Sequence, residues 1–431
     1  MIRIYDGRSD LAAVLDQLTR RNRDADQGIL SEVRSILKDV KERGDDALVA
    51  LTRRFDWPEA TAKGLRVGQD EIDAAYSKVA PELLKSLRES AKNIFEFHEL
   101  QRREGFMTGP AGRRVGQIVR PLRRVGVYVP GGRAAYPSSV LMNVIPAKVA
   151  GVEQIAMVTP ADQAGKVPPL TLVAANEAGV TEMYRVGGAQ AVAALAYGTE
   201  SIKKVDKIVG PGNIYVALAK REVFGTVGID MVAGPSEVLI IADARANPAY
   251  VAADMLSQAE HDPLAAAICV TTDPAFASRV QTELALQTLD QPRRKIIEQS
   301  LENQGALVVA KNLSDAVDIA NAVAPEHLEL MVENPGSLLE RIENAGSVFL
   351  GDFSPEPLGD YYAGPNHILP TSGTARFASP LSVDDFIKKM GVILYSRDAL
   401  AAAARDIMRF AAAEGLGAHA RSVGIRFEKN G

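Results

Sequence analysis

Apolar positions recur at helical spacing through the first hundred residues of the chain. The pattern predicts helices over residues 10–21, 30–55 and 71–100, with Pro81 as a break in the last of them. These segments are rich in charge, and their single histidine, His98, is expected to be solvated and without function. We therefore expect residues 1–105 to form a helical N-terminal scaffold.

The pattern changes near residue 125, where short apolar runs begin to alternate with helical stretches. The runs predict strands over residues 125–129, 154–158, 183–186, 207–209, 237–242, 267–271, 306–310 and 347–350. Between them the spacing predicts helices over residues 138–149, 170–178, 189–196, 214–223 and 248–260. Strands that alternate with helices of this length are typical of βαβ units and parallel sheets.

The alternation divides into two series, which predict two α/β domains. We assign residues 125–236 to the first, and residues 237–380 together with 106–124 to a second, discontinuous domain. After residue 380 helical spacing returns over 384–390 and 398–414, so residues 381–431 are expected to form a helical arm. The expected fold class is α/β, with two Rossmann-like parallel-sheet domains.

Composition narrows the class of protein. The 431 residues carry a formal charge of −5, which disfavours nucleic acid and anionic membranes as partners. The single cysteine, Cys269, excludes an intrachain disulfide, and its apolar surroundings favour a buried small side chain over a nucleophile. No signal peptide and no membrane-spanning stretch are evident, so a cytoplasmic location is expected.

Four of the five histidines lie at predicted element ends or in loops rich in glycine and proline, each beside a carboxylate or an amide. Gln258 and His261 share a helix face just before Pro263, so they can chelate a metal or simply form a polar helix end. In the segment 357–367, turn residues surround Asp360 and His367, which can complete a metal site or form an ordinary turn. The tail residues Glu414 and His419 flank a glycine-rich turn. This turn can bring them to a site on a neighbouring subunit, or it can be part of a frayed, solvated terminus. The four pairs are Gln258 with His261, Glu326 with His327, Asp360 with His367, and Glu414 with His419.

Glu326 and His327 join a predicted helix end to an alternating strand. On a regular element adjacent side chains diverge, but at a junction both can face one pocket. An imidazole with an ordinary pKa of ~6.5 suits proton transfer near neutral pH, and a carboxylate beside it can activate water. The alternative is a surface pair without chemistry.

Two glycine-rich turns run from a predicted strand into a helix. One contains Gly210, Gly212 and Asn213, and the other contains Gly187, Gly188 and Gln190. Either can cradle a phosphate at a helix N-terminus or be an ordinary turn. Tyr215 stands where the dinucleotide fingerprint has its third glycine.

Taken together, these stretches resemble the histidinol dehydrogenase family. The likeness runs in order from about residue 125 to 426, and eight motifs carry it: Tyr128-Val-Pro-Gly-Gly, Val186-Gly-Gly-Ala-Gln-Ala, Gly210-Pro-Gly-Asn, Ala233-Gly-Pro-Ser-Glu-Val, Ser257-Gln-Ala-Glu-His, Ala324-Pro-Glu-His-Leu-Glu, Asp360-Tyr-Tyr-Ala-Gly-Pro-Asn-His and Glu414-Gly-Leu-Gly-Ala-His-Ala. The resemblance implies oxidation of L-histidinol through L-histidinal to L-histidine, the final steps of histidine biosynthesis, with two NAD consumed. It also implies a homodimer with shared active sites, in which the C-terminal arm crosses to the partner and each site holds one zinc ion.

The resemblance also implies a role for each residue that matches a family motif. The zinc ligands would be Gln258, His261, Asp360 and His419, which also contact substrate, and the general acid–base pair would be Glu326 and His327. His327, Ser236, His367 and Glu414 would hold substrate. Tyr128, Gln190 and Asn213 would contact NAD, in what the family has as an atypical Rossmann-type site.

The charge of such a zinc site fits a substrate-orienting role. Two imidazoles, one amide and one carboxylate leave the ion with residual positive charge, so it can accept the amine and imidazole nitrogens of histidinol. Mn²⁺ and Co²⁺ also accept nitrogen and oxygen ligands. One alternative is an enzyme related to this family that oxidises another small primary alcohol, such as a sulfonated diol. A second is a metallohydrolase, although the His-Glu-x-x-His motif that is frequent in such enzymes is absent. A third is a non-catalytic nucleotide-binding regulator.

Overall fold

The computed structural model describes residues 2–9, 11–19, 27–131 and 135–428 of the chain. The chain divides into two compact units. The first comprises residues 1–101 and 122–386, and the second comprises residues 102–121 and 387–431.

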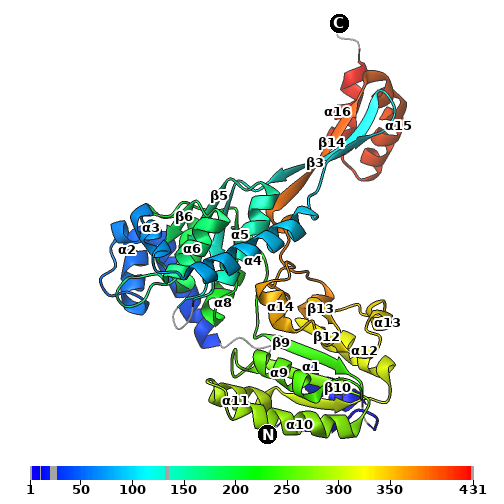
Figure 1. Ribbon diagram of the computed structural model, residues 1–431. Coiled ribbons are helices and arrows are strands. Elements are labelled where there is room, and N and C mark those ends of the chain that lie inside the picture. The colour runs from blue at the N-terminus through cyan, green and yellow to red at the C-terminus, as the bar shows by residue number, and fades with distance from the viewer. Residues whose placement is uncertain (1, 10, 20–26, 132–134, 429–431) are drawn as a thin grey trace. The chain divides into compact units, whose positions relative to one another are not determined.

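The first unit contains two parallel sheets, of which one is formed by the middle of the chain (Figure 1). Its strands lie in the order β6-β5-β4-β7-β8 and all pair in parallel. The order reverses between β4 and β7, as at the switch point of doubly wound sheets. The strands are β4 (Arg124–Tyr128), β5 (Gln154–Val158), β6 (Glu182–Tyr184), β7 (Lys207–Val209) and β8 (Gly228–Ile229).

Helices cover both faces of this sheet, which explains why its strands are apolar on both sides. One core layer packs β4 and β5 against α3 (Gln69–Tyr76), α4 (Pro81–Glu99), α5 (Pro137–Ala150) and α6 (Pro169–Ala178). The other packs the sheet against α2 (Gln27–Phe55), α7 (Gly188–Tyr197) and α8 (Ile214–Val223). The predicted break at Pro81 is confirmed, because this residue begins α4.

The second sheet repeats the same strand order and adds one strand at an edge. Its order is β1-β11-β10-β9-β12-β13, again entirely parallel, with the reversal between β9 and β12. The strands are β1 (Arg3–Asp6), β9 (Glu237–Ala242), β10 (Ala266–Thr271), β11 (Ala306–Val309), β12 (His327–Met331) and β13 (Ser347–Leu350). The α/β fold class with parallel sheets is confirmed.

Two further core layers sandwich the second sheet. One contains α9 (Pro248–Ala259), α10 (Pro274–Thr288) and α11 (Arg294–Asn303). The other contains α1 (Leu11–Thr19), α12 (Leu313–Val323) and α13 (Gly336–Leu339). Short helices complete the unit: α14 (Glu356–Tyr361), η1 (Ala62–Gly64), η2 (Thr374–Arg376) and η3 (Val383–Phe386).

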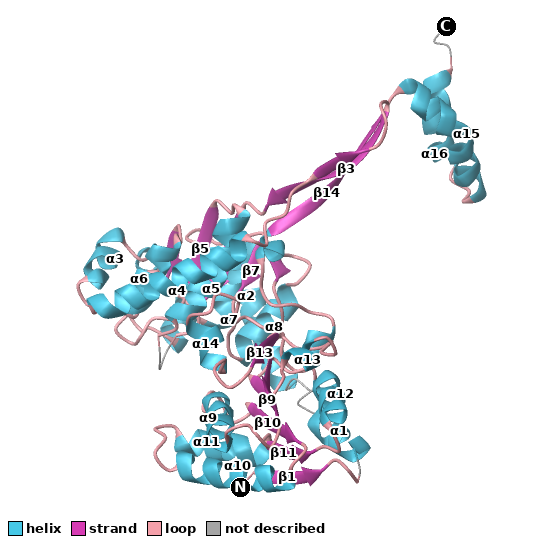
Figure 2. Cartoon of the chain, turned by 45° about the vertical axis from the view of Figure 1, so that its right-hand side comes forward, coloured by secondary structure: helices cyan, strands magenta, loops and turns pink. Residues whose placement is uncertain are grey.

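The second unit is a ribbon of antiparallel strands followed by helices (Figure 2). Strand β3 (Arg113–Pro121) pairs along its whole length with β14 (Ile387–Tyr395), and β2 (Phe106–Thr108) pairs with β3. The chain then forms α15 (Arg397–Ala413), α16 (Gly417–Gly424) and η4 (Ile425–Phe427).

Two predictions are wrong in this region. The expected helix over 384–390 is instead the short helix η3 followed by β14, because β-branched and aromatic residues after Gly391 extend the segment and β3 supplies a partner over nine residues. Residues 106–121 belong with this ribbon and do not join the sheet of 237–380. The C-terminal segment therefore contains the strand β14 as well as helices, where only helix was expected.

Two predictions for the N-terminal segment are also wrong. The segment is not purely helical, because Arg3–Asp6 form β1 and pair with β11 of the second sheet. His98 is fully buried, and its Nδ1 donates to the carbonyl of Ile94 at 2.7 Å while Nε2 lies 3.3 Å from the amide nitrogen of Asn366. Burial lowers the pKa of His98 below its usual value. Its polar neighbours in sequence lie on other faces of α4, so the charged character of this stretch did not indicate that His98 is buried in the core.

Candidate active site

The end of α9 brings the predicted pair Gln258 and His261 together. Gln258 is completely buried, and its Nε2 lies 3.2 Å from Nδ1 of the exposed His261. The Oε1 atom of Gln258 is also buried and has no hydrogen-bond partner among the described residues. A buried amide oxygen without a donor is an atom that a metal ion can satisfy, which fits the predicted ligand role.

Glu326 and His327 lie where the chain enters β12, and both are buried. The Nδ1 atom of His327 lies 3.1 Å from the carbonyl oxygen of Glu237. A carbonyl can only accept, so Nδ1 carries the proton and Nε2 keeps its lone pair. That Nε2 atom is buried and has no hydrogen-bond partner in the described part of the chain. Burial lowers the pKa of His327, although the carboxylate of Asp360 opposes this effect.

The Glu326 carboxyl is fixed by the strand next to it. Its Oε2 accepts the backbone N–H of Glu237 at 2.9 Å. Burial raises the pKa of Glu326 well above its ordinary value, despite that hydrogen bond. A carboxylate with a raised pKa is a stronger proton acceptor once it is ionised.

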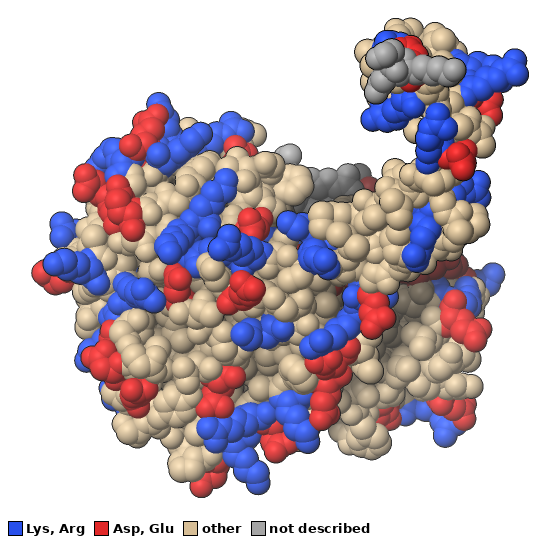
Figure 3. Space-filling view, turned by 90° about the horizontal axis from the view of Figure 1, so that it is seen from above, with Lys and Arg blue, Asp and Glu red and all other residues tan. Residues whose placement is uncertain are grey.

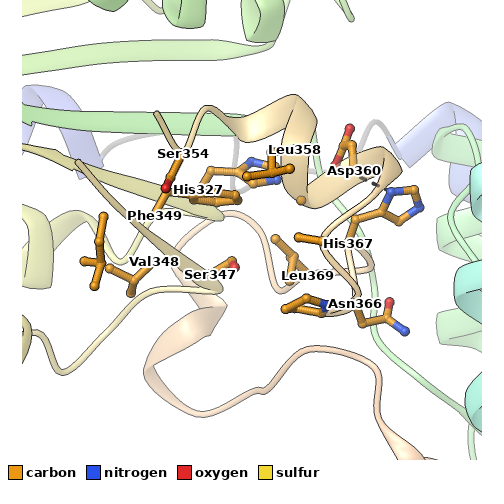
Figure 4. A pocket seen from close by; sticks show the side chains of 14 residues that line it. His327, Ser347, Val348, Phe349, Ser354, Leu358, Asp360, Asn366, His367 and Leu369 are labelled. Carbon is orange, nitrogen blue, oxygen red and sulfur yellow. Dashed lines mark ion pairs between the residues drawn. The ribbon is translucent and has the colours of Figure 1, made fainter. Parts of the chain in front are cut away.

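A pocket of about 270 Å³ adjoins His327 and is lined partly by Asp360 and His367 (Figure 4). Asp360 is in α14, so it is held by a short helix and not by the turn that the sequence predicted. Its Oδ1 lies 3.5 Å from Nδ1 of His367. Burial raises the pKa of Asp360, but the contacts with His367, His327 and His261 together outweigh burial, and the pKa is lowered. Phe349 forms an aromatic wall of the pocket, with its ring centroid 6.0 Å from that of His327.

Glu356 is a buried acid of this site that the sequence analysis missed. Potential ligand atoms of His327, Glu356 and Asp360 lie within 4.8 Å of one another. Burial, reinforced by Asp360, raises the pKa of Glu356 to about 7. Glu356 lies four residues before Asp360, a spacing that places both on one helix face and that could have revealed it.

Two more buried acids connect the elements that carry the site. Glu329 Oε1 accepts the backbone N–H of Glu356 at 2.9 Å, and Ser257 donates its hydroxyl to Glu356 at 2.9 Å. Asp254 and Glu329 share a side-chain hydrogen bond, and burial raises the pKa of Asp254 to about 6 and that of Glu329 well above normal. These contacts join α9, β12 and α14.

The candidate active site therefore lies at the amino edge of the second sheet. His327 is the first residue of β12, Glu326 immediately precedes it, and the half-buried Ser236 immediately precedes β9. Ligand sites of open α/β sheets usually lie at the carboxyl edge. Here the end of α9 and the helix α14 supply the remaining groups at the opposite edge.

The predicted cofactor residues lie at the carboxyl edge of the first sheet. Tyr128 ends β4, and its hydroxyl accepts the backbone N–H of Gly188 at 3.1 Å, at the start of α7. Gln190 is buried in the first turn of α7, and its Nε2 donates to Asp56 at 3.3 Å. Burial raises the pKa of Tyr128 to about 12 and also raises that of Asp56, which the sequence analysis missed.

Asn213 caps the next helix along this edge. Its side chain accepts the backbone N–H groups of Tyr215 and Val216 at 3.1 and 3.2 Å, and the residue is otherwise exposed. The turn before it is held tightly against β4, because a Cβ on Gly210 would lie 2.1 Å from the Tyr128 carbonyl oxygen. The strand order makes β4 and β7 neighbours, so Tyr128 and the turn 210–213 share the switch point.

Glu414 and His419 belong to the second unit of the chain. Glu414 follows α15, His419 lies in α16, and both side chains are exposed. The structure thus brings together Gln258 with His261, Glu326 with His327, and Asp360 with His367. It provides no placement of the two tail residues beside them.

Charged groups on the surface are mixed. On the face shown in Figure 3, Lys and Arg side chains are interspersed with Asp and Glu. Within the described residues, no helix is both long and apolar enough to span a membrane.

Two parallel sheets of this strand order, with a buried imidazole beside candidate metal ligands on one and glycine-rich turns at the carboxyl edge of the other, define an α/β protein with a candidate metal site and a candidate nucleotide site. The family model for histidinol dehydrogenase matches residues 19–427. A histidinol dehydrogenase of Caldanaerobacter subterraneus is 54% identical over 428 residues, 99% of each chain. One from Heliobacterium mobile is 55% identical over 405 residues, covering 94% of this chain and 95% of that protein.

A solved structure supports the same relationship. The crystal structure of histidinol dehydrogenase from Elizabethkingia anophelis superposes with a TM-score of 0.93 at 39% identity, covering 99% of this chain and 98% of that one. The chain belongs to the histidinol dehydrogenase family. The predictions of an enzyme, a dehydrogenase of histidine biosynthesis, are confirmed.

Proposed function

We propose that the protein oxidises L-histidinol through L-histidinal to L-histidine with NAD, and that it requires zinc. The observation that supports this proposal most directly is the tautomer of His327. Its Nδ1 proton is committed to the Glu237 carbonyl at 3.1 Å, while its buried Nε2 has no partner in the described chain. A neutral imidazole in this tautomer is ready to take a proton from a substrate hydroxyl at Nε2.

The residues at the end of α9 and in α14 fit a zinc site. Gln258 would supply its unpartnered Oε1, and His261 and Asp360 would supply a nitrogen and an oxygen, a donor set that zinc accepts. His419 of the partner subunit would be the fourth ligand in a homodimer with shared sites. When bound, the ion would hold the amine and imidazole of the substrate.

The chain's own groups then divide the two oxidations between them. His327 accepts the alcohol proton in the first step. Glu326 accepts a proton from the water that adds to the aldehyde before the second oxidation, and its fixed Oε2 and raised pKa suit this role. Ser236, His367 and the partner's Glu414 would hold the substrate.

Tyr128, Gln190 and Asn213 would bind NAD at the carboxyl edge of the first sheet. NAD supplies the hydride acceptor. Support comes from the switch point between β4 and β7, where these residues gather. We also propose that the protein acts in the cytoplasm.

The stoichiometry of NADH tests the reaction. Purified protein with zinc, excess NAD and limiting histidinol should yield about two NADH per histidinol, because the aldehyde is oxidised in the same site. A yield near one, with histidinal released, would contradict the second oxidation. A sulfonated diol serves as the competing substrate, and faster turnover of that alcohol would contradict histidinol as the substrate.

A further inference from the structure

A buried ion pair lies beneath the turn at the switch point of the first sheet. Lys220 and Asp230 form a salt bridge, and their side chains are only 2% and 1% exposed. Lys220 is in α8, and Asp230 follows β8. Removing two charges from water is costly, and an apolar pair of similar size is often as stable. The pair therefore calls for an explanation other than stability.

Both charged groups hold the same glycine. The Nζ atom of Lys220 donates to the carbonyl oxygen of Gly210 at 2.8 Å. The Oδ2 atom of Asp230 accepts the backbone N–H of Gly210 at 2.8 Å. Every backbone hydrogen-bonding group of Gly210 is thus fixed by one member of the pair. Side chains in helices lean toward the N-terminus, which explains how Lys220 reaches the turn that precedes its own helix.

The position of Gly210 determines where the rest of the turn lies. Its φ of +111° is a conformation that favours glycine, and its Cα lies against the Tyr128 carbonyl, where a Cβ would come within 2.1 Å. Asn213 follows three residues later and is the N-cap of α8. Fixing Gly210 therefore fixes Asn213 relative to Tyr128.

We propose that Lys220 and Asp230 are positioning residues for the dinucleotide: together they clamp Gly210 and thereby set the turn 210–213 in the conformation that binds NAD. This inference rests on the proposed cofactor site. Neither side chain needs to touch the cofactor, since both lie beneath the turn and are shielded from solvent. Their effect is on affinity, because a turn that is already ordered loses less entropy on binding.

The test separates positioning from stability. The double variant Lys220→Met/Asp230→Leu removes both charges together, so it leaves no buried ion unpaired and should fold, with a thermal midpoint lowered by the loss of the two hydrogen bonds to Gly210. We expect its dissociation constant for NADH, measured by fluorescence titration of the full-length protein, to rise by about tenfold or more. Bound zinc, measured by metal analysis, should not change.

A second ion pair in the same sheet, of which the Arg124 side chain is 7% and the Glu182 side chain 20% exposed, provides the control. Arg124 and Glu182 begin β4 and β6 at the amino edge, with a nitrogen–oxygen distance of 2.8 Å. Arg124→Met/Glu182→Leu should leave NADH affinity unchanged. An equal loss in both double variants would indicate a general effect on the sheet and would overturn the proposal, as would unchanged affinity in a folded Lys220→Met/Asp230→Leu protein.

A conservative variant keeps the test decisive if the apolar pair does not fold. Lys220→Gln/Asp230→Asn retains a donor for the Gly210 carbonyl and an acceptor for its N–H, so NADH affinity should stay within about threefold of the parent. A folded protein that lost tenfold would contradict positioning through Gly210. Asn213→Ala tests the cofactor site itself: no effect there would refute both proposals, whereas weakened binding with unaffected ion-pair variants would refute only the clamp.

Discussion

The Nδ1 atom of His327 lies 3.7 Å from Oε2 of Glu326, although the two residues are adjacent in the chain. Adjacent side chains on a regular strand point to opposite faces. The pair is possible because His327 is the first residue of β12 and Glu326 precedes it, with its carboxyl fixed to the backbone of Glu237 at 2.9 Å. One junction thus supplies both an imidazole and a carboxylate.

Glu326→Gln should separate the two oxidations. The amide retains an acceptor for the Glu237 N–H but cannot take a proton from water. We expect oxidation of histidinal to fall by about 10²–10⁴-fold while oxidation of histidinol to the aldehyde is largely kept. Separate assays with each substrate measure this, with His327→Asn as the matched variant that should slow both. Equal losses in the two steps of Glu326→Gln would remove its assigned role.

Removal of the metal should stop turnover without unfolding the protein. Apolar side chains, not the predicted ligands at the end of α9 and in α14, hold the core layers together, so chelator-treated protein should stay folded. Its thermal midpoint should fall, because the buried Oε1 of Gln258 loses its partner. Metal analysis should show loss of zinc in parallel with activity, and added zinc should restore both. Full activity in metal-free protein would contradict the assignment of Gln258, His261 and Asp360.

Mixed dimers should reveal whether a site is completed by a partner. His261→Ala and His419→Ala chains should each be inactive alone, because each lacks a proposed zinc ligand. Co-refolded mixtures should regain activity, up to about a quarter of the parent at equal ratios if the ligands come from different chains. Verified heterodimers without any recovery would show that the site is not shared.

His98 should make the fold sensitive to mild acid. Burial lowers its pKa in the folded state below the ordinary 6.5, whereas the unfolded chain takes up a proton near that value. The stability contributed by the neutral imidazole is therefore present above pH 6.5 and lost as the pH falls below it. Thermal midpoints at pH 7 and 5 measure this loss.

His98→Gln is the control for that measurement, because its amide can still donate to the Ile94 carbonyl but does not titrate. The variant should lose less stability than the parent between pH 7 and 5. Identical losses in the two proteins would show that other groups cause the acid sensitivity.

Much of the two-sheet core could be predicted from the sequence, because the pattern that indicates each strand lies within a few neighbouring residues. Strands β9 and β13 have the predicted bounds, because runs of three to five consecutive apolar residues between turn signals have few alternatives. Strand β14 was mistaken for a helix, because its partner β3 lies more than 250 residues earlier and no local pattern reveals such pairing. His98 was misjudged for a similar reason, since its burial depends on packing against distant segments that include Asn366.

The candidate site was predictable as a set of residues but not as an arrangement. Chemistry-bearing pairs such as Gln258 and His261 stand out by helical spacing alone. Their place at the amino edge of the second sheet depends on strand order, which no short motif encodes. Glu356 and Asp254 were missed because an acidic side chain is ordinarily solvated, and only the packing of distant segments shows that these two are buried.

The first strand of the chain has a practical consequence for anyone who shortens the protein. A chain beginning at residue 27 would retain α2 and every later helix, but the backbone of β11 would lose the neighbour that β1 provides from Arg3 to Asp6. Unpaired sheet edges promote self-association. Such a truncated protein should therefore precipitate or form oligomers, even though none of its proposed reactive groups has been removed.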